Sequence, residues 1–473
     1  MLSISVLLSF ALAVAAHEHH DELSEEAANA PVDTILWIHI VLQAAVWGVL
    51  FPIGMVFGIT RSRWHVPLQS AGYALTLGGY FLGHAHKGRQ FLPSAHEKFG
   101  SILFIPILAQ LALGIYLKLH IHEHTLRPYA VRAHGIVGKA FPIFGWVQML
   151  FGAIAFRGYC RGGNLGQCLA HYIMGGGFIS YGIIMAIMLI VGETWIRRSG
   201  RSPEWWDSWV ILLWVSVNTF TEHRGLVWSV KDMQHTILGI LWWCGGILGV
   251  FLARNNQRTV VPSVIIILTG FAMADHPQAL MISTRVHAIF GYTLMLAGFA
   301  RIVEVCFVMP HFAPVPGAAA VTGTVQLEDD QSEHTLADGN VIEEGQPKGR
   351  AFRHLPPFLL VSAGLLFMSA TDEELDFVND NGMDHVTYVL IMFSISFILY
   401  THTLFLINLY ATSGRNAPDT TANAKDIELE TPRGNGRWYS RTAHVERRRD
   451  LNGEPTSASA LMQAHIIGED DDE

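Results

Sequence analysis

The stretch VDTILWIHIVLQAAVWGVLFPIGMVFGI, residues 32–59, contains one carboxylate near its start, one histidine and no other ionisable side chain. A hydrocarbon core about 30 Å thick takes roughly 20 helical residues to cross, so this run is long enough to span a bilayer. Further apolar runs follow near residues 66–83, 99–117, 135–156, 171–192, 206–222, 235–253, 259–274, 287–309, 355–370 and 385–410. The sequence therefore predicts an all-α polytopic membrane protein with about eleven transmembrane helices.

The composition of the chain agrees with this fold class. Of its 473 residues, 51% are hydrophobic and only 15% are charged, against about 25% in an ordinary soluble domain. This balance excludes a soluble globular enzyme, a disordered protein and a small disulfide-stapled secreted domain. The net charge is −9, and no basic surface of the kind that binds nucleic acid is evident, so the expected surroundings are a lipid bilayer.

The ends of the chain differ from the apolar runs. Residues 1–16 form an apolar stretch that is too short to span and ends in small residues, so we expect a cleaved signal peptide. The rest is expected to divide into a short luminal His-rich segment (17–31), a helical bundle (32–192), a second transmembrane bundle of four helices (193–309), a flexible cytosolic loop (310–354), two last transmembrane helices (355–410) and a disordered cytosolic tail (411–473).

A signal peptide places the mature N-terminus in the lumen or outside the cell, and an odd number of spans then places the C-terminus in the cytosol. The links that carry most of the basic residues fall on the cytosolic side, as the positive-inside rule requires. These residues are Arg61, Arg63, Lys118, Arg127, Arg132, Arg197, Arg198, Arg201, Arg254 and Arg258. The chain is thus expected in a secretory-pathway membrane. Whether this is an endomembrane, the vacuole or the plasma membrane, and whether the protein is a homodimer, are left open.

Four histidines occur at two depths of the first helices. His39 and His96 lie near the outer side, whereas His65 and His134 lie near the inner side. A histidine within a membrane is costly unless it is paired, hydrogen-bonded or bound to a metal. Two imidazoles at one depth on different helices can hold a haem iron from both sides.

Glycine follows two of these histidines at the next helical turn. Gly100 lies four residues after His96, and Gly138 lies four residues after His134. This spacing puts both residues on one helical face, where glycine leaves room for a flat macrocycle. The alternative interpretation is that the histidines merely cap helix ends at the membrane interface.

Residues 32–155 resemble the transmembrane core of the cytochrome b561 family, the haem bundle also found in ferric reductases. The matching stretches are WIH at 37–39, PIG at 52–54, HVPLQ at 65–69, AHEKFG at 95–100 and AHGIVGK at 133–139. The resemblance implies that His39 with His96 binds an outer b-type haem and that His65 with His134 binds an inner one. Six-coordinate irons suit one-electron transfer rather than oxygen chemistry.

The resemblance also implies a transmembrane metalloreductase. A cytosolic small-molecule donor similar to ascorbate would supply electrons, and a luminal or extracellular metal ion, ferric or cupric, would accept them. Basic residues near the inner site are the candidates for binding an anionic donor: Arg61, Arg63, Lys118, Arg127 and Arg132. The sequence departs from the reductases because no DOMON, flavin or nicotinamide domain is present and six further helices follow. Taken whole, it resembles uncharacterised fungal integral membrane proteins of the Ytp type.

Two further sets of residues are candidates for metal binding at the outer face. One set lies at the ends of helices in the second half: His223, His235, His276 and His287. This set is expected to hold an additional metal ion or haem, and the alternative is a ring of helix caps. The other set is His17 and His19, which follow the cleavage site and have the spacing of a square-planar copper chelate.

Cys160 and Cys168 share one expected outer loop. An oxidising compartment favours a local disulfide there, and two free thiols are the alternative.

Two other classes of function are compatible with the same sequence. A metal or solute transporter explains why the chain has more spans than a haem bundle requires. A non-catalytic membrane scaffold explains the long polar loop and tail. Haem content distinguishes the electron carrier from both, because the scaffold predicts a colourless protein and the transporter predicts uptake that does not need His39 or His96.

Overall fold

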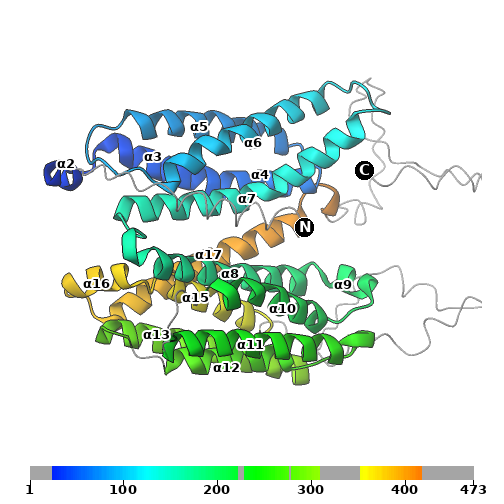
Figure 1. The fold of residues 1–473 in the computed structure, drawn as a ribbon. Coiled ribbons are helices and arrows are strands. Elements are labelled where there is room, and N and C mark those ends of the chain that lie inside the picture. Colours follow the sequence, from blue (N-terminus) through cyan, green and yellow to red (C-terminus); the bar gives the residue numbers. More distant parts are fainter. Residues whose placement is uncertain (1–23, 222–227, 229, 276–277, 309–351, 418–473) are drawn as a thin grey trace, which may run out of the picture.

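The structure is a computed structural model that describes residues 24–221, 228, 230–275, 278–308 and 352–417. Within these ranges all regular structure is helical, and the long helices run nearly parallel in two bundles (Figure 1). The expected signal peptide, most of the expected loop 310–354 and nearly all of the expected tail lie outside the described residues.

The first bundle contains the helices before residue 158. In chain order they are α2 (Glu25–Asn29), α3 (Thr34–Ala45), η1 (Val46–Leu50), α4 (Phe51–Ile59), α5 (His65–Ala85), α6 (Ala95–Lys118) and α7 (Arg127–Arg157). The segment α3–η1–α4 forms one continuous rod with a π-helical turn in the middle. There the Phe51 N–H donates to the Val46 carbonyl, and Pro52 follows without an N–H of its own, which favours a widened turn.

The helices of the first bundle form two pairs, α3–α4 with α5 and α6 with α7. Close contact between the pairs is concentrated at mid-height, where η1 and α4 meet α7. A buried aromatic cluster fills this level and contains Val46, Trp47, Phe51 and Phe141. It separates the upper and lower parts of the bundle.

The second bundle contains the remaining helices. They are η2 (Gly162–Asn164), α8 (Leu165–Ile190), α9 (Glu193–Ser199), α10 (Pro203–Thr221), α11 (Val230–Leu252), η3 (Arg254–Asn256), α12 (Val261–Ala274), α13 (Met281–Val303), η4 (Glu304–Val308), α15 (Leu355–Met368), α16 (Asp372–Asp380), α17 (His385–Thr412) and η6 (Gly414–Asn416). Its main core surrounds α13 and α15, with Val286, Leu294, Ala363 and Leu366 fully or almost fully buried.

Helix α8 belongs to this second bundle, which corrects the expected boundary at residue 192. It packs along α15, and a side chain at Gly175 or Gly364 would collide with the backbone of the other helix. The boundary thus falls between α7 and α8. Sequence distance hid this arrangement, because 164 residues of chain separate α15 from α8.

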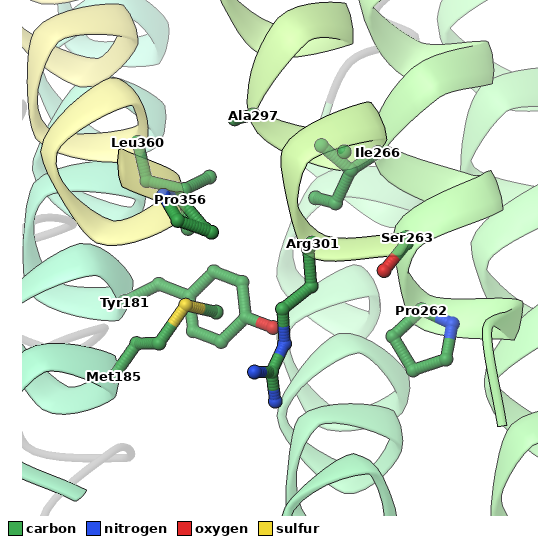
Figure 2. Close-up of a pocket in the computed structure, with 10 residues that line it drawn as sticks. Tyr181, Met185, Pro262, Ser263, Ile266, Ala297, Arg301, Pro356 and Leu360 are labelled. Atoms are coloured by element: carbon green, nitrogen blue, oxygen red, sulfur yellow. The ribbon is translucent and has the colours of Figure 1, made fainter. Parts of the chain in front are cut away.

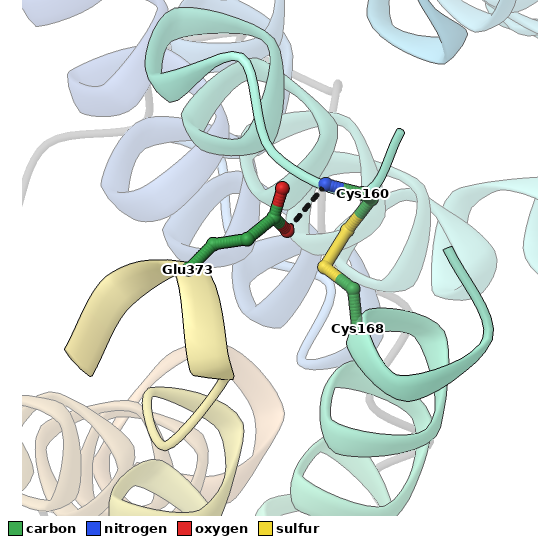
Figure 3. A group of neighbouring side chains, drawn as sticks. All are labelled: Cys160, Cys168 and Glu373. Carbon is green, nitrogen blue, oxygen red and sulfur yellow. Dashed lines mark hydrogen bonds between the residues drawn. A yellow bond between two sulfur atoms is a disulfide. The ribbon is translucent and has the colours of Figure 1, made fainter. Parts of the chain in front are cut away.

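Two connections join the bundles. Helix α17 packs against α4 of the first bundle as well as α8 and α15 of the second. At the end of the molecule that carries α16, Cys160 and Cys168 are joined in a disulfide and the Cys160 N–H donates to a Glu373 carboxylate oxygen at 2.8 Å (Figure 3). The two sulfur atoms are bonded to each other, so this group of three residues is a structural link and not a thiolate metal site.

Each expected apolar run coincides with a helix. Seven of the described helical segments are long and apolar enough to cross a membrane, or up to eight if the bent pair α15–α16 forms one span. Helix α12, with 14 residues, is too short to meet this criterion. The chain is therefore an all-helical polytopic membrane protein, while length and composition do not confirm the count of eleven spans.

Candidate functional site: facing pairs of histidines

His39 on α3 and His96 on α6 face each other near the end of the first bundle that carries α2. Their ring centres are 6.2 Å apart and the ring planes are nearly perpendicular, at 87°. His39 donates from Nδ1 to the Gly79 carbonyl at 2.7 Å, and His96 donates from Nδ1 to the Gln148 carbonyl at 3.1 Å. Because a carbonyl only accepts, each ring keeps its lone pair on Nε2.

His65 on α5 and His134 on α7 repeat this arrangement at the other end of the bundle. Their ring centres are also 6.2 Å apart, at an interplanar angle of 89°. His65 donates from Nδ1 to the Gly54 carbonyl at 2.7 Å. The Nδ1 atom of His134 is buried without a hydrogen-bond partner among the described residues. The sequence thus predicted both pairings that the helices bring together.

One glutamine side chain makes the same contact at each of the two histidine pairs. The Gln148 side chain donates to the His96 carbonyl at 2.9 Å, and the Gln110 side chain donates to the His134 carbonyl at 3.0 Å. Gly100 and Gly138 make room for these two glutamines, because a Cβ at either position would lie under 3 Å from the glutamine nitrogen. The glutamine contacts were absent from the sequence expectation, which assigned both glycines to the packing of haem.

Other glycines lie against the histidine rings. A Cβ at Gly83 would meet the His39 ring at 2.7 Å, and one at Gly58 would meet the His65 ring at 2.8 Å. A Cβ at Gly152 would lie 3.0 Å from the His96 ring, and one at Gly114 would lie 3.5 Å from the His134 ring, which is an ordinary van der Waals contact. Sequence reasoning missed these glycines because each lies on a different helix from the ring that it accommodates.

The separation of the rings fits a metal ion between them. A nitrogen ligand lies about 2 Å from a transition-metal ion, and the centre of its ring about 1 Å further, so two opposed imidazoles stand about 6 Å apart. All four histidines are only half-buried although they point between helices. The Gln110 and Gln148 Oε1 atoms are buried without partners among the described residues. The facing imidazoles and the orphan polar atoms fit a flat iron macrocycle at each level.

The candidate donor-binding residues gather at the end of the bundle that contains His65 and His134. Arg61 and Arg63 lie on the turn between α4 and α5, whereas Lys118, Arg127 and Arg132 lie at the end of α6 and the start of α7. All are exposed except Arg127, which is half-buried.

A third pair of histidines occurs in the second bundle. His287, near the start of α13, faces His171, near the start of α8, with their Nε2 atoms 3.3 Å apart. The ring centres are 5.5 Å apart at 85°. His171 was absent from the sequence-predicted set, although HYIMG at residues 171–175 has the same His-x3-Gly spacing that drew attention to other histidines.

Of the other predicted metal ligands, the described part of the chain contains His235. His235 lies half-buried on α11. His17, His19, His223 and His276 lie outside the described residues. The expected outer set of four histidines therefore stays a prediction.

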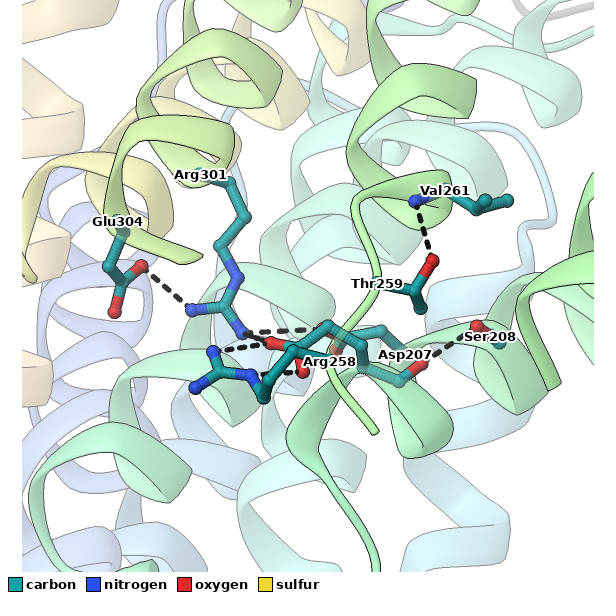
Figure 4. Close-up of polar contacts among 8 residues, drawn as sticks. Asp207, Ser208, Arg258, Thr259, Val261, Arg301 and Glu304 are labelled. Atoms are coloured by element: carbon teal, nitrogen blue, oxygen red, sulfur yellow. Dashed lines mark hydrogen bonds and ion pairs between the residues drawn. The ribbon is translucent and has the colours of Figure 1, made fainter. Parts of the chain in front are cut away.

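A buried ionic cluster lies at the opposite end of the second bundle (Figure 4). Glu204 accepts two hydrogen bonds from Arg258, at 2.7 and 2.8 Å, and one from Arg301 at 3.1 Å. Arg301 also contacts Glu304 at 2.7 Å and Asp207 at 3.5 Å. Paired charges of this kind hold α10, α13 and the segment before α12 together, because separation would leave a buried charge uncompensated.

Beside this cluster is a cavity with room for about one water molecule. Tyr181, Ser263 and Arg301 supply its polar lining, and Met185 and Leu360 supply part of its apolar lining (Figure 2). The cavity is too small for an organic substrate. Sequence reasoning missed the cluster, although Arg301 and Glu304 interrupt the apolar run 287–309.

Two known protein families match most of the described chain. The family described as "Protein YTP1-like, C-terminal" matches residues 144–411, and a domain of unknown function, DUF2427, matches residues 19–120. No match to the cytochrome b561 family occurs, so the resemblance of residues 32–155 to that family is wrong. Histidines and glycines near the ends of successive helices are a geometric requirement of paired-imidazole sites and do not by themselves indicate ancestry.

Among individual proteins, the chain is 44% identical over 260 residues to protein YTP1 of Saccharomyces cerevisiae, covering 54% of this chain and 50% of YTP1. It is 23% identical over 233 residues to an uncharacterized membrane protein of Schizosaccharomyces pombe, covering 39% of this chain and 46% of that protein. A second uncharacterized membrane protein of Saccharomyces cerevisiae is 22% identical over 296 residues, covering 51% and 42%.

The chain thus aligns with about half the length of these curated relatives or less. No solved structure matches it. The YTP1-like family model matches more than half of the chain. This agrees with the resemblance to Ytp-type proteins that was expected from the sequence. The chain belongs to the YTP1-like family of membrane proteins.

Proposed function

We propose that the first bundle is a transmembrane electron carrier in which His39 with His96, and His65 with His134, hold two b-type haems. The observation that carries the proposal is the equal spacing of the two pairs: both have ring centres 6.2 Å apart and nearly perpendicular planes. Two unrelated helix-capping histidines have no physical reason to adopt this spacing twice.

The chain's own residues prepare both sites. The carbonyls of Gly79, Gly54 and Gln148 accept the Nδ1 protons of three of the rings, which fixes the tautomer and orients Nε2 for a metal. Haems held by these two histidine pairs would supply one-electron exchange.

The level between the two pairs excludes water. Trp47, Phe51 and Phe141 pack against one another there, and the Trp47 indole N–H donates to the Thr76 hydroxyl at 2.9 Å. This aromatic cluster separates the two sites.

The direction of transfer follows from charge. The basic side chains around the His65 end attract an anionic cytosolic donor of the ascorbate type, and an external ferric or cupric ion is the acceptor at the His39 end. This assignment includes an outward N-terminus, eleven spans and a secretory-pathway membrane, and the distribution of basic residues supports its orientation.

The test is purification from cells supplied with haem, followed by haem quantification and a reduced-minus-oxidised absorption spectrum. We expect about two six-coordinate haems per chain. Replacing both His39 and His96 with leucine should remove one haem, and so should the double replacement of His65 and His134. His171→Leu is the matched control, because it removes a paired histidine outside the first bundle and should leave both haems.

A folded, monodisperse protein without haem would overturn the proposal. Uptake of a metal or solute into proteoliposomes, unaffected by His39→Leu or His96→Leu, would then support the transporter. Loss of cellular function on removal of the tail after Ser413 would support the scaffold.

A further inference from the structure

We propose that Asp207 is a proton-binding site in the second bundle, where it holds one exchangeable proton within the buried ionic cluster (Figure 4). The cluster consists of Glu204, Asp207, Arg258, Arg301 and Glu304. The site is formed by carboxylates of the second bundle, so it does not depend on haem binding in the first bundle.

Arg301 serves three carboxylates of this cluster at once. Its guanidinium group contacts Glu304 at 2.7 Å, Glu204 at 3.1 Å and Asp207 at 3.5 Å. Glu204 also accepts the two short hydrogen bonds from Arg258. The cluster therefore contains three carboxylates and two guanidinium groups, which leaves one negative charge in excess when all five side chains are ionised.

This excess charge lies away from water. The side chains of Glu204, Arg301 and Glu304 are at most 7% exposed, and that of Asp207 is 14% exposed. An uncompensated charge is strongly unfavourable in such surroundings, and a buried acid takes up a proton instead. One bound proton makes the cluster neutral.

The contacts indicate Asp207 as the residue that holds this proton. Arg301 donates hydrogen bonds to Glu304 and Glu204, whereas its contact with Asp207 is an ion pair at 3.5 Å without a hydrogen bond. Glu204 and Asp207 lie one turn apart on α10 and share the same guanidinium nitrogen, Nη2 of Arg301. When two carboxylates share one site, the less well paired one keeps a proton.

Other charged groups of the neighbouring elements do not replace the proton. Among the described residues, the ion pair with Arg301 is the one that Asp207 makes. Arg201, just before α10, and Arg254, in η3, each lie over an aromatic ring. Helix α12 carries no charged side chain, and the charged side chains of α11 lie within its first two turns, far along the helix from η3.

Two orphan atoms of the cluster indicate a water molecule beside it. The Arg301 Nε donor and the Glu304 Oε1 acceptor are buried without hydrogen-bond partners among the described residues. The cavity lined by Tyr181, Ser263 and Arg301 has room for about one water molecule. Such a water can accept the Arg301 Nε hydrogen.

Tyr181 connects this cavity to Asp207. Its hydroxyl interacts with the Asp207 carboxyl, and the same hydroxyl lines the cavity and points toward Arg301 (Figure 2). The hydroxyl gives its proton to the carboxylate and takes one from the cavity water, so one O–H bond forms on Asp207 while the phenol stays neutral. The water regains its proton from solvent.

The site links proton binding to helix packing. Loss of the proton from Asp207 places a third buried negative charge beside Arg301, which weakens the contact between α10 and α13. Buried acids in membrane helices act in this way in proton relays and proton-coupled transport. In the orientation proposed above, the start of α10 is cytosolic, so the proton is exchanged with the cytosol.

The experiment is infrared difference spectroscopy of the full-length protein in lipid bilayers, between about pH 8 and about pH 5. Exposed carboxylates titrate near pH 4 and stay mostly ionised in this range. We expect a carbonyl band of a buried carboxylic acid that grows as the pH falls and is absent from Asp207→Asn. Tyr181→Phe should keep this band but slow its appearance after a pH jump.

Asp376→Asn is the matched control, because it removes an exposed carboxylate of α16 by the same change. It should keep the band. A band that persists in Asp207→Asn would overturn the proposal, and so would its loss in Glu304→Gln alone, which would place the proton on Glu304.

If Asp207→Asn does not fold, Asp207→Glu takes its place, because it keeps a carboxyl group. The band should then shift in frequency, and an unshifted band would overturn the proposal. Haem content, measured on the same samples, tests the electron-carrier proposal separately.

Discussion

The two bundles use facing histidines in different ways. In the first bundle the rings stand 6.2 Å apart and remain half-buried between the two helix pairs. In the second bundle the rings stand 5.5 Å apart and are almost fully buried among tightly packed helices. The facing rings are thus farther apart and less buried in the first bundle than in the second.

Glycine explains this difference. Gly83 and Gly58 face histidine rings in the first bundle, so their missing side chains accommodate imidazole. Gly175 and Gly291 face the backbone of neighbouring helices, because an added Cβ would collide with the Gly364 oxygen and with the Gly270 oxygen, respectively. In the second bundle glycine therefore brings helix backbones together, which closes the space that the first bundle keeps.

The largest expected effect is on this backbone contact. Gly175→Val places side-chain atoms against the backbone of α15, which cannot move without separating α8 from α15. We expect a loss of about 3 kcal/mol in the free energy of unfolding of the second bundle, measured by denaturant titration in detergent.

Gly176→Val is the matched control on the adjacent residue, because a Cβ there meets only the flexible Met368 side chain at 3.8 Å. It should cost less than about 1 kcal/mol. If the two variants unfold alike, backbone approach at Gly175 does not hold the second bundle together.

A smaller effect is expected from adding a methyl group in the first bundle. Gly83→Ala pushes against the His39 ring at 2.7 Å while its hydrogen bond to the Gly79 carbonyl resists movement. We expect weakened binding at the outer site only, seen as haem content falling from about two toward one per chain.

Gly78→Ala lies on the same helix, and a Cβ there meets nothing within 4 Å. It should keep full haem content. Unchanged haem in Gly83→Ala would show that the His39 ring does not need its observed position, which would weaken the proposed pairing with His96.

The smallest expected effect concerns the helix starts at the surface. The backbone N–H groups of Lys87 and Leu36 donate to Asp33, at the start of α3, and hold the pKa of its carboxyl below the ordinary value. The stabilisation is present above the ordinary pKa of about 4. It is lost as the pH falls through the lower pKa of the folded state.

Asn at this position keeps a capping oxygen but does not titrate. Asp33→Asn should therefore remove most of the acid-induced loss of amide protection at the start of α3, measured by hydrogen exchange from about pH 6 to about pH 3. Asp384, whose pKa is lowered in the same way by the Thr387 N–H, caps α17 and serves as the internal control. Amide protection at the start of α17 should still decrease as the pH falls. An equal acid-induced loss of amide protection at the start of α3 in Asp33→Asn and in the unsubstituted protein would contradict this role of Asp33.

Much of the fold could be read from the chain. Long apolar runs have to become helices in a bilayer, because backbone groups there cannot bond to water, and the observed helices lie at those runs. The pairs His39–His96 and His65–His134 were predictable for a related reason: antiparallel neighbouring helices bring residues of equal depth to the same level.

The tertiary structure decided what lies opposite each side chain. The spacing His-x3-Gly is identical at residues 96–100, 134–138, 171–175 and 287–291, yet the first two glycines face glutamine and the last two face backbone. A sequence period fixes which residues share one helical face. It does not determine which helix packs against that face, or at what distance.

The partnership of His171 with His287 is the clearest case. The two residues are 116 positions apart, and they meet because α8 and α13 both pack against α15, which comes later than either in the chain. The sequence by itself determined a helical membrane protein with histidines at defined depths. Helix packing alone brought His171 and His287 together and set how much space lies between facing histidines, because that space depends on side chains contributed by distant helices.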